Sequence, residues 1–190
     1  MRGTADAAIL EATDVPVPVP AAGQVLVKMR AASLNRGEFI VGHGLLKRGT
    51  TKPAGMEGSG EVVGTGEPVM GRCAGAFSQY AVMDVREAMA MPAGLSFESA
   101  AGIPLTFLVV HDMLVLQGRL RAGEWVLVAG VSSSVGVASL QAATELGAHV
   151  IGTSGSKGKL EKLQALGLDV AIQTRAPDFH DAVMEATGGK

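Results

Sequence analysis

The stretch that decides the fold covers residues 125–167 and reads WVLVAGVSSSVGVASLQAATELGAHVIGTSGSKGKLEKLQALG. Short apolar segments alternate in it with longer amphipathic segments, and Gly147 and Gly167 stand where two helices should end. The same alternation continues towards the end of the chain. The expected elements are strands over 125–129, 149–153 and 170–172 and helices over 135–146, 156–166 and 177–186. This order predicts a parallel sheet covered by helices on both faces, as in one mononucleotide-binding half of a doubly wound α/β fold.

The preceding part of the chain has the pattern of a β domain. Val15 to Pro20 alternates valine with proline, which disfavours helix and predicts an extended segment. Short strands separated by glycine-rich turns, such as GMEGSG at residues 55–60, are expected up to about Met91. The expected strands cover residues 24–32, 61–65 and 76–83. We therefore expect a β domain over residues 1–95 and an α/β domain over residues 96–190.

A long helix is expected at the start of the second domain. Ser96 can cap it, and the apolar pattern carries it to about Gln117. Its most apolar part, Ile103 to Leu116, is interrupted by polar residues and is shorter than the ~20 residues of a membrane span. The segment is therefore interpreted as a buried helix.

The composition narrows the classes of partner and compartment. Of the 190 residues 47% are hydrophobic and 18% are charged, and the formal net charge is −2. No basic stripe suggests a nucleic-acid partner, and no segment suggests a membrane anchor. Cys73 is the only cysteine, which excludes an internal disulfide and favours a reducing cytoplasm. The four histidines lie far apart in the sequence and are not expected to bind a metal: His43, His111, His149 and His180.

The turn GVSSSVG at residues 130–136 lies between the first expected strand of the α/β half and its first helix. Backbone N–H groups at such a turn can receive a pyrophosphate. The strict G-x-G-x-x-G pattern is incomplete, because Val131 and Ser133 stand at its first two glycine positions and only Gly136 is kept. A plain serine cap on a core helix is the alternative. A nucleophile elbow and a Walker A loop are excluded by spacing.

The segment TSGSKGK at residues 153–159 follows the second expected strand. An NAD site usually has a carboxylate here to bind the ribose 2′-hydroxyl, whereas this segment has hydroxyls, Lys157 and Lys159. That chemistry suits a 2′-phosphate and hence NADPH. The alternative is a solvated helix start with ordinary surface lysines.

These segments together resemble the zinc-independent quinone oxidoreductase branch of the medium-chain dehydrogenase/reductase superfamily. The resemblance extends over nearly the whole chain and is most specific from MPAGLSFESAAGIPLTF at residues 91–107 to the end of the stretch quoted first. It implies a GroES-like β domain followed by a partial Rossmann domain. It also implies hydride transfer from NADPH to a small-molecule quinone or α,β-unsaturated carbonyl (enone).

The resemblance assigns roles to individual residues. Thr174 stands where many members place a tyrosine beside the adenosine, and Asn35 matches an asparagine that lines the cleft near the nicotinamide. The alternative for Asn35 is a turn-forming residue. The residues implied at the pyrophosphate are Ser133, Ser134 and Val135, and those implied at the adenosine ribose phosphate are Ser154, Gly155, Ser156 and Lys159.

The resemblance also predicts that no zinc is used. Zinc-dependent relatives have a cysteine near Asn35 and a histidine before the glutamate of a G-H-E segment, which here reads Gly55-Met56-Glu57. A sulfur and nitrogen ligand set is therefore incomplete. Apolar residues occupy positions where some members have hydroxyl groups in the substrate cleft, so no proton donor is assigned and water is the candidate.

Family members continue beyond the position of Lys190 into a fourth strand, whereas this chain stops. We therefore expect a shortened reductase in which the strand over 125–129 has a bare edge, and a bare edge favours a homodimer. The alternative is a non-catalytic nucleotide-binding or interaction module.

Overall fold

The computed structural model describes residues 1–5, 7–42 and 45–189. The chain forms two compact units, Met1–Leu105 and Thr106–Lys190, and each is described here by itself. The domain division expected at residues 95/96 stays a prediction. In the described part of the chain, no helix has the length and apolar character needed to cross a membrane.

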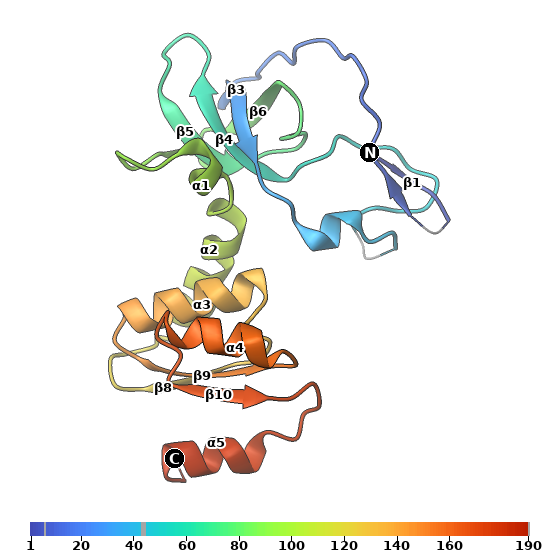
Figure 1. Cartoon of the computed structure of the whole chain (residues 1–190). Coiled ribbons are helices and arrows are strands. Elements are labelled where there is room, and N and C mark those ends of the chain that lie inside the picture. Colours follow the sequence, from blue (N-terminus) through green and yellow to red (C-terminus); the bar gives the residue numbers. More distant parts are fainter. Residues whose placement is uncertain (6, 43–44, 190) are drawn as a thin grey trace. The chain divides into compact units, whose positions relative to one another are not determined.

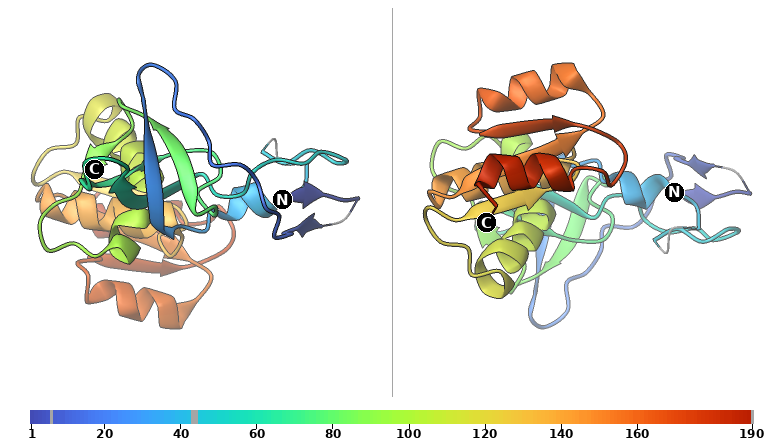
Figure 2. Two further views of the ribbon diagram at one scale, coloured as in Figure 1. Left: turned by 90° about the horizontal axis from the view of Figure 1, so that it is seen from above. Right: turned by 90° about the horizontal axis from the view of Figure 1, so that it is seen from below.

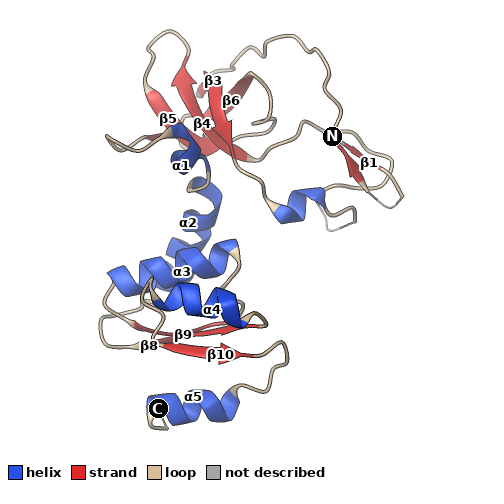
Figure 3. Cartoon of the chain, in the orientation of Figure 1, coloured by secondary structure: helices blue, strands red, loops and turns tan. Residues whose placement is uncertain are grey.

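The first unit contains a five-stranded antiparallel sheet with the strand order β6-β3-β4-β5-β7 (Figures 1 and 3). A two-stranded ribbon of β1 and β2 precedes the sheet in the sequence, and a short 3-10 helix, η1, lies between β3 and β4. Val27, Val69 and Met83 form its buried core. The bounds are β1 Arg2–Gly3, β2 Ala8–Ile9, β3 Gln24–Ala32, η1 Arg36–Phe39, β4 Glu57–Val62, β5 Pro68–Arg72, β6 Tyr80–Asp84 and β7 Met89–Ala90.

Two strands of this sheet differ from the expected ranges 61–65 and 76–83. β4 begins at Glu57 and ends at Val62, and β6 covers only Tyr80–Asp84. The interpretation of the segment GMEGSG as a turn is therefore wrong. Its glycines serve close packing, because a Cβ at Gly60 would overlap the carbonyl oxygen of Lys28 on β3.

The expected helix over residues 96–117 is divided into three segments, α1 Phe97–Ala101, α2 Pro104–Val110 and the π-helical η2 His111–Gln117. Ser96 caps α1 as predicted, since its hydroxyl accepts a hydrogen bond from Ser99 N at 3.2 Å. Pro104 starts a new helix because proline favours the first helical turn.

The interpretation of Ile103 to Leu116 as a buried helix is wrong for its second half, although Pro104 and Val110 in its first half are buried. Met113 is 51% exposed and Leu116 60%, and no residue of η2 is buried. An apolar pattern indicates that a segment can be covered, but it does not identify the group that covers it.

The second unit has the predicted parallel sheet, with the strand order β10-β9-β8. Helices α3 and α4 lie on one face of this sheet and α5 lies on the other (Figures 1 and 2). β8 pairs only with β9 among the described residues, so its expected edge position is confirmed. The bounds are β8 Trp125–Val128, α3 Ser134–Glu145, β9 His149–Ser154, α4 Lys157–Gln164, β10 Val170–Gln173 and α5 His180–Thr187.

The core of this unit lies between the sheet and helices α3 and α4, where Leu140, Val150 and Leu160 are buried. Leu163 is also buried, but Leu166 follows the end of α4 and is 46% exposed. The helix expected over residues 156–166 is therefore shorter than predicted and ends at Gln164. Gly147 and Gly167 have φ values of 76° and 97° next to the ends of α3 and α4, the left-handed conformation that glycine adopts most readily.

Candidate functional site

The turn between β8 and α3 is built on two close contacts. Val131, at the first glycine position of the dinucleotide pattern, is fully buried in the core. Gly152 makes room for it, because a Cβ at Gly152 would lie 2.6 Å from Val131 Cγ1. A Cβ at Gly136 would lie 2.5 Å from Gly130 O and 2.6 Å from Val131 Cα. The chain therefore keeps the glycine that lets the helix approach the strand, and it fills the first glycine position with a core side chain.

This turn leaves backbone donors open at the start of α3. The Ser133 hydroxyl accepts a hydrogen bond from Gly136 N at 3.1 Å and thereby caps the helix. The N–H groups of Ser134 and Val135 have no hydrogen-bond partner among residues 1–5, 7–42 and 45–189, and both residues are exposed. Open N–H groups at the positive end of a helix fit a pyrophosphate.

The turn after β9 is hydrogen-bonded to this first turn. Ser154 Oγ lies 2.8 Å from Ser132 Oγ and accepts a hydrogen bond from Ser156 N at 3.3 Å. Gly130 N donates to Thr153 Oγ1 at 3.1 Å. The two turns therefore form one polar surface at the carboxyl ends of neighbouring parallel strands, which is where ligands bind in doubly wound folds.

Three cationic residues lie in or beside the segment that follows β9. Lys157 and Lys159 lie in the first turn of α4 and are exposed, although the positive end of a helix dipole disfavours cations. The Arg175 side chain lies over Gly155, since a Cβ at Gly155 would overlap Arg175 Nε. None of the three forms an ion pair with a described acidic side chain. The arrangement fits an anion such as a ribose 2′-phosphate.

Thr174 reaches the same edge of the sheet through its backbone. Its N–H donates to Ser154 O at 3.1 Å. Its hydroxyl donates to Asp178 Oδ1 at 2.7 Å, within its own turn. The second unit thus brings together eight of the nine residues expected to bind the cofactor: Ser133, Ser134, Val135, Ser154, Gly155, Ser156, Lys159 and Thr174.

Asn35, the ninth, belongs to the first unit. Its backbone oxygen accepts a hydrogen bond from Glu38 N and so starts η1, as a turn-forming residue would. Its side-chain amide donates to Glu57 Oε1 at 2.9 Å and to Ser33 Oγ at 3.1 Å. The role of Asn35 at a cofactor stays a prediction.

Sequence reasoning missed Arg175 and the partners of Asn35. Arg175 could have been found from its place shortly after β10, where parallel strands direct residues to the ligand edge. The buried Glu57 gave no comparable signal, because a single glutamate in a strand is usually exposed.

The described chain contains no group of three or more histidine, cysteine, aspartate or glutamate side chains placed to hold a metal. His43 lies outside the described residues. Burial, reinforced by the charge of Glu57, raises the pKa of the Cys73 thiol to about 11. Cys73 is therefore protonated at neutral pH and is a poor nucleophile.

Known proteins resemble both units. The family described as zinc-binding dehydrogenase matches residues 134–190, a segment without cysteine. The pikromycin polyketide synthase component PikAII of Streptomyces venezuelae is 36% identical over 180 residues, which are 88% of this chain and 5% of that protein.

Solved structures extend the likeness over almost the whole chain. The CurK enoyl reductase is 26% identical with a TM-score of 0.83, and the match covers 98% of this chain and 63% of that one. The quinone oxidoreductase of Thermus thermophilus, also solved with NADPH, is 26% identical with a TM-score of 0.81, and the match covers 95% of this chain and 60% of that one. The chain thus spans less than two thirds of these relatives.

The parallel sheet of the second unit, with polar turns at the carboxyl ends of β8 and β9, has the arrangement of a Rossmann-type fold, in which dinucleotides bind at that edge. The matched family and these solved structures belong to the medium-chain dehydrogenase/reductase superfamily, and this chain shares their fold over nearly its whole length.

Proposed function

We propose that the chain binds NADPH and supports hydride transfer to the carbon–carbon double bond of an α,β-unsaturated carbonyl, without zinc. The observation that carries the proposal is the cationic turn after β9: Arg175 lies over Gly155, Lys157 and Lys159 follow in the first turn of α4, and none of the three has an acidic partner in the described chain. A carboxylate there would repel a 2′-phosphate, and none is present between Thr153 and Lys159.

The two hydrogen-bonded turns bind different parts of NADPH. The N–H groups of Ser134 and Val135 bind the pyrophosphate, and the Ser133 hydroxyl keeps the first turn of α3 in place. Ser154, Gly155, Ser156 and Lys159 contact the ribose phosphate, with Thr174 beside the adenosine. Arg175 adds a planar donor group that suits a phosphate.

When bound, NADPH supplies the hydride, and the substrate's own conjugation makes the receiving carbon electrophilic. The protein orients the two reactants and keeps competing water away from them. Asn35 is assigned to the nicotinamide side. No side chain is assigned as the proton donor, and we expect water to supply the proton.

Enone reduction is favoured over quinone reduction by two relatives, a polyketide synthase and an enoyl reductase. Quinone reduction is the second candidate because a quinone oxidoreductase solved with NADPH has a similar fold. A paired assay with a 2-enoyl thioester and a benzoquinone separates the two. NADPH binding without turnover of either substrate would instead support a non-catalytic nucleotide-binding module.

The proposal is tested first by titrating the chain with NADPH and with NADH, followed by nicotinamide fluorescence. Lys159→Ala should weaken NADPH binding about tenfold, since a hydrogen bond to a charged group contributes roughly 1.5–3 kcal/mol. NADH binding should change little. Lys162→Ala, in the last turn of the same helix, is the matched control. Equal binding of both nucleotides, unaffected by Lys159→Ala, would overturn the NADPH assignment.

Two further expectations remain part of the proposal. The open edge of β8 suits a homodimer, which strand pairing between two copies would form. The single cysteine suits a reducing compartment such as the cytoplasm.

A further inference from the structure

Glu57 is a buried carboxylate whose hydrogen-bond donors come from two other segments of the first unit. It begins β4 and is 1% exposed. Its Oε1 accepts hydrogen bonds from the Ser33 hydroxyl and from Asn35 Nδ2, and its Oε2 accepts one from Leu105 N at 2.6 Å. All four residues belong to the first unit. A buried charge is tolerated when it is hydrogen-bonded in this way.

The directions of these hydrogen bonds fix the orientation of the Asn35 amide. The Ser33 hydroxyl donates its single proton to Glu57 Oε1, so it offers Asn35 only an acceptor oxygen. Ser33 Oγ and Glu57 Oε1 are therefore both acceptors, and the NH2 group of the Asn35 amide must point towards them. The amide oxygen Oδ1 lies at the other end, where it has no hydrogen bond to another described residue, and Asn35 is only half-buried.

We propose that Glu57 is a positioning residue that holds the Asn35 amide with its oxygen outward, so that position 35 recognises a hydrogen-bond donor. This inference rests on the proposed function, in which Asn35 faces the nicotinamide half of NADPH. The donor it would meet there is a ribose hydroxyl or the carboxamide N–H. Glu57 does not touch the cofactor and acts only through Asn35.

The substitution Glu57→Gln keeps the size of the side chain at position 57 but changes the hydrogen bonds that orient the Asn35 amide. In the unsubstituted chain, Ser33, Asn35 and Leu105 donate to the two carboxylate oxygens of Glu57. Glutamine at this position has only one oxygen, and an NH2 group replaces the other. If its oxygen faces Leu105 N, its NH2 faces Asn35, which must turn its own oxygen inward. If its oxygen faces Asn35, the N–H of Leu105 loses its acceptor. Glu61→Gln is the matched control, because Glu61 lies in the same strand and its side chain forms an exposed pair with Arg30.

The first experiment reads the amide directly and needs no cofactor. Asn35 is the only asparagine in the sequence, so labelling with side-chain ¹⁵N-asparagine gives one pair of amide signals in an NMR spectrum. We expect one proton of the pair to be shifted downfield and slow to exchange. Glu57→Gln should move the pair, Ser33→Ala should move it less, and Glu61→Gln should leave it in place. A freely exchanging pair in the unsubstituted chain, or a pair unaffected by Glu57→Gln, would overturn the proposal.

The second experiment measures the consequence for the ligand. Glu57→Gln should weaken NADPH binding about tenfold, the effect of one lost or reversed hydrogen bond to an oriented group, and leave the affinity for 2′,5′-ADP unchanged. Lys159→Ala should weaken both ligands. Unchanged NADPH affinity in Glu57→Gln, with the amide signals moved, would refute the donor assignment. If the unsubstituted chain binds neither ligand, the proposed function fails, while the NMR experiment still decides the role of Glu57.

Discussion

The two units handle charge in opposite ways. In the first unit the carboxylate of Glu57 is buried, and donors from Ser33, Asn35 and Leu105 surround it. In the second unit the cations of Lys157, Lys159 and Arg175 gather at one turn and have no acidic partner in the described chain. A satisfied cluster stabilises and orients its own side chains, whereas an unsatisfied one at the surface favours a ligand.

The largest effect should come from the packing that holds the open turn in place. In Gly136→Ala the new Cβ would meet backbone atoms of Gly130 and Val131 within 2.7 Å, and backbone cannot move aside as a flexible side chain can. We expect the free energy of unfolding to fall by about 3 kcal/mol, as in severe overpacking. Urea denaturation measures it.

Gly158→Ala is the control, because a Cβ at Gly158 has no atom within 4 Å. Alanine in this helix should stabilise the protein by about 0.5–1 kcal/mol. If both alanine variants unfold at the same urea concentration, the close contact at Gly136 is not what positions the turn.

The first unit contains a second buried glutamate, Glu38. Glu38 is fully buried, its Oε1 accepts a hydrogen bond from Gly55 N at 2.9 Å, and Lys52 Nζ lies 3.5 Å away. Its Oε2 has no partner in the described structure. Glu38→Gln keeps an acceptor for Gly55 but removes the charge that faces Lys52.

We expect Glu38→Gln to lower the free energy of unfolding by about 2 kcal/mol, the order of a charged hydrogen bond. Urea denaturation of the variant, beside Lys52→Met, measures the loss from each side of the pair. A more stable Glu38→Gln variant would mean that the unpartnered oxygen costs more than the ion pair contributes.

The open cluster can be altered without breaking the fold. Gly155→Ala should displace Arg175, whose flexible end overlaps the position of the new Cβ. The side chain can move away, so stability should change by less than about 0.5 kcal/mol. NADPH binding should weaken about fivefold, since roughly 1 kcal/mol of phosphate interaction is lost. Arg175→Ala should give a similar loss, and full affinity in both variants would remove Arg175 from the site.

The sequence predicted the second unit better than the first for a physical reason. The parallel strands and their helices follow apolar periodicity and helix-ending glycines, so β8, β9, β10, α3 and α4 lie close to their expected ranges. The start of strand β4 was missed because Gly58 and Gly60 have the composition of a turn but serve close strand packing. Composition does not distinguish these two uses of glycine.

The candidate site likewise contains residues that a local sequence pattern can predict and residues that it cannot. Ser133 to Val135 and Ser154 to Lys159 are neighbours in the sequence, so a local motif can predict them. Arg175 meets Gly155 across 20 residues, and Glu57 meets Asn35 across 22. Such contacts follow from strand order and register, which local patterns do not encode.

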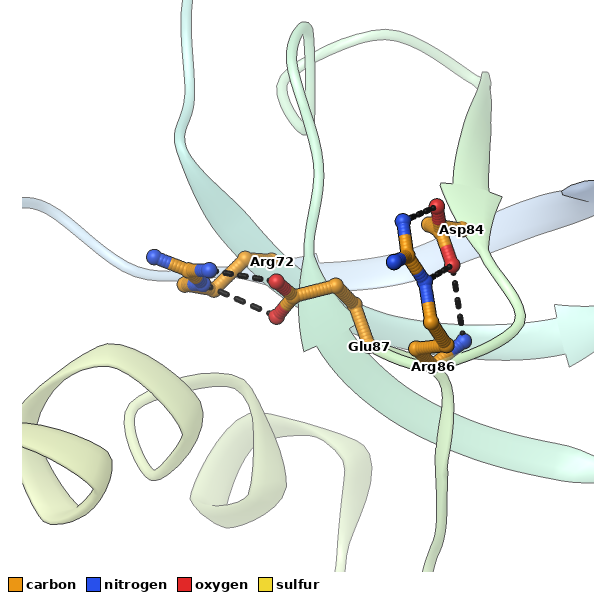
Figure 4. Close-up of polar contacts among 4 residues, drawn as sticks. All are labelled: Arg72, Asp84, Arg86 and Glu87. Carbon is orange, nitrogen blue, oxygen red and sulfur yellow. Dashed lines mark hydrogen bonds and ion pairs between the residues drawn. The ribbon is translucent and has the colours of Figure 1, made fainter.

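The smallest effect should come from two surface ion pairs of the first unit, Arg72 with Glu87 and Arg86 with Asp84 (Figure 4). Hydrogen bonds from Arg86 hold the pKa of Asp84 well below its ordinary value of 3.8, and the hydrogen bond from Arg72 lowers the pKa of Glu87 from 4.5. Because the folded-state pKa values are depressed, the stabilisation is present above the ordinary values and is lost as the pH falls through the folded-state ones. We therefore expect the melting temperature to fall slightly below about pH 4.

The variant Arg86→Ala tests this expectation. Its melting temperature should fall less on acidification, and thermal melts between about pH 6 and pH 2 compare the variant with the unsubstituted chain. An equal fall in both would show that the ion pair between Arg86 and Asp84 does not contribute to the acid sensitivity of the first unit.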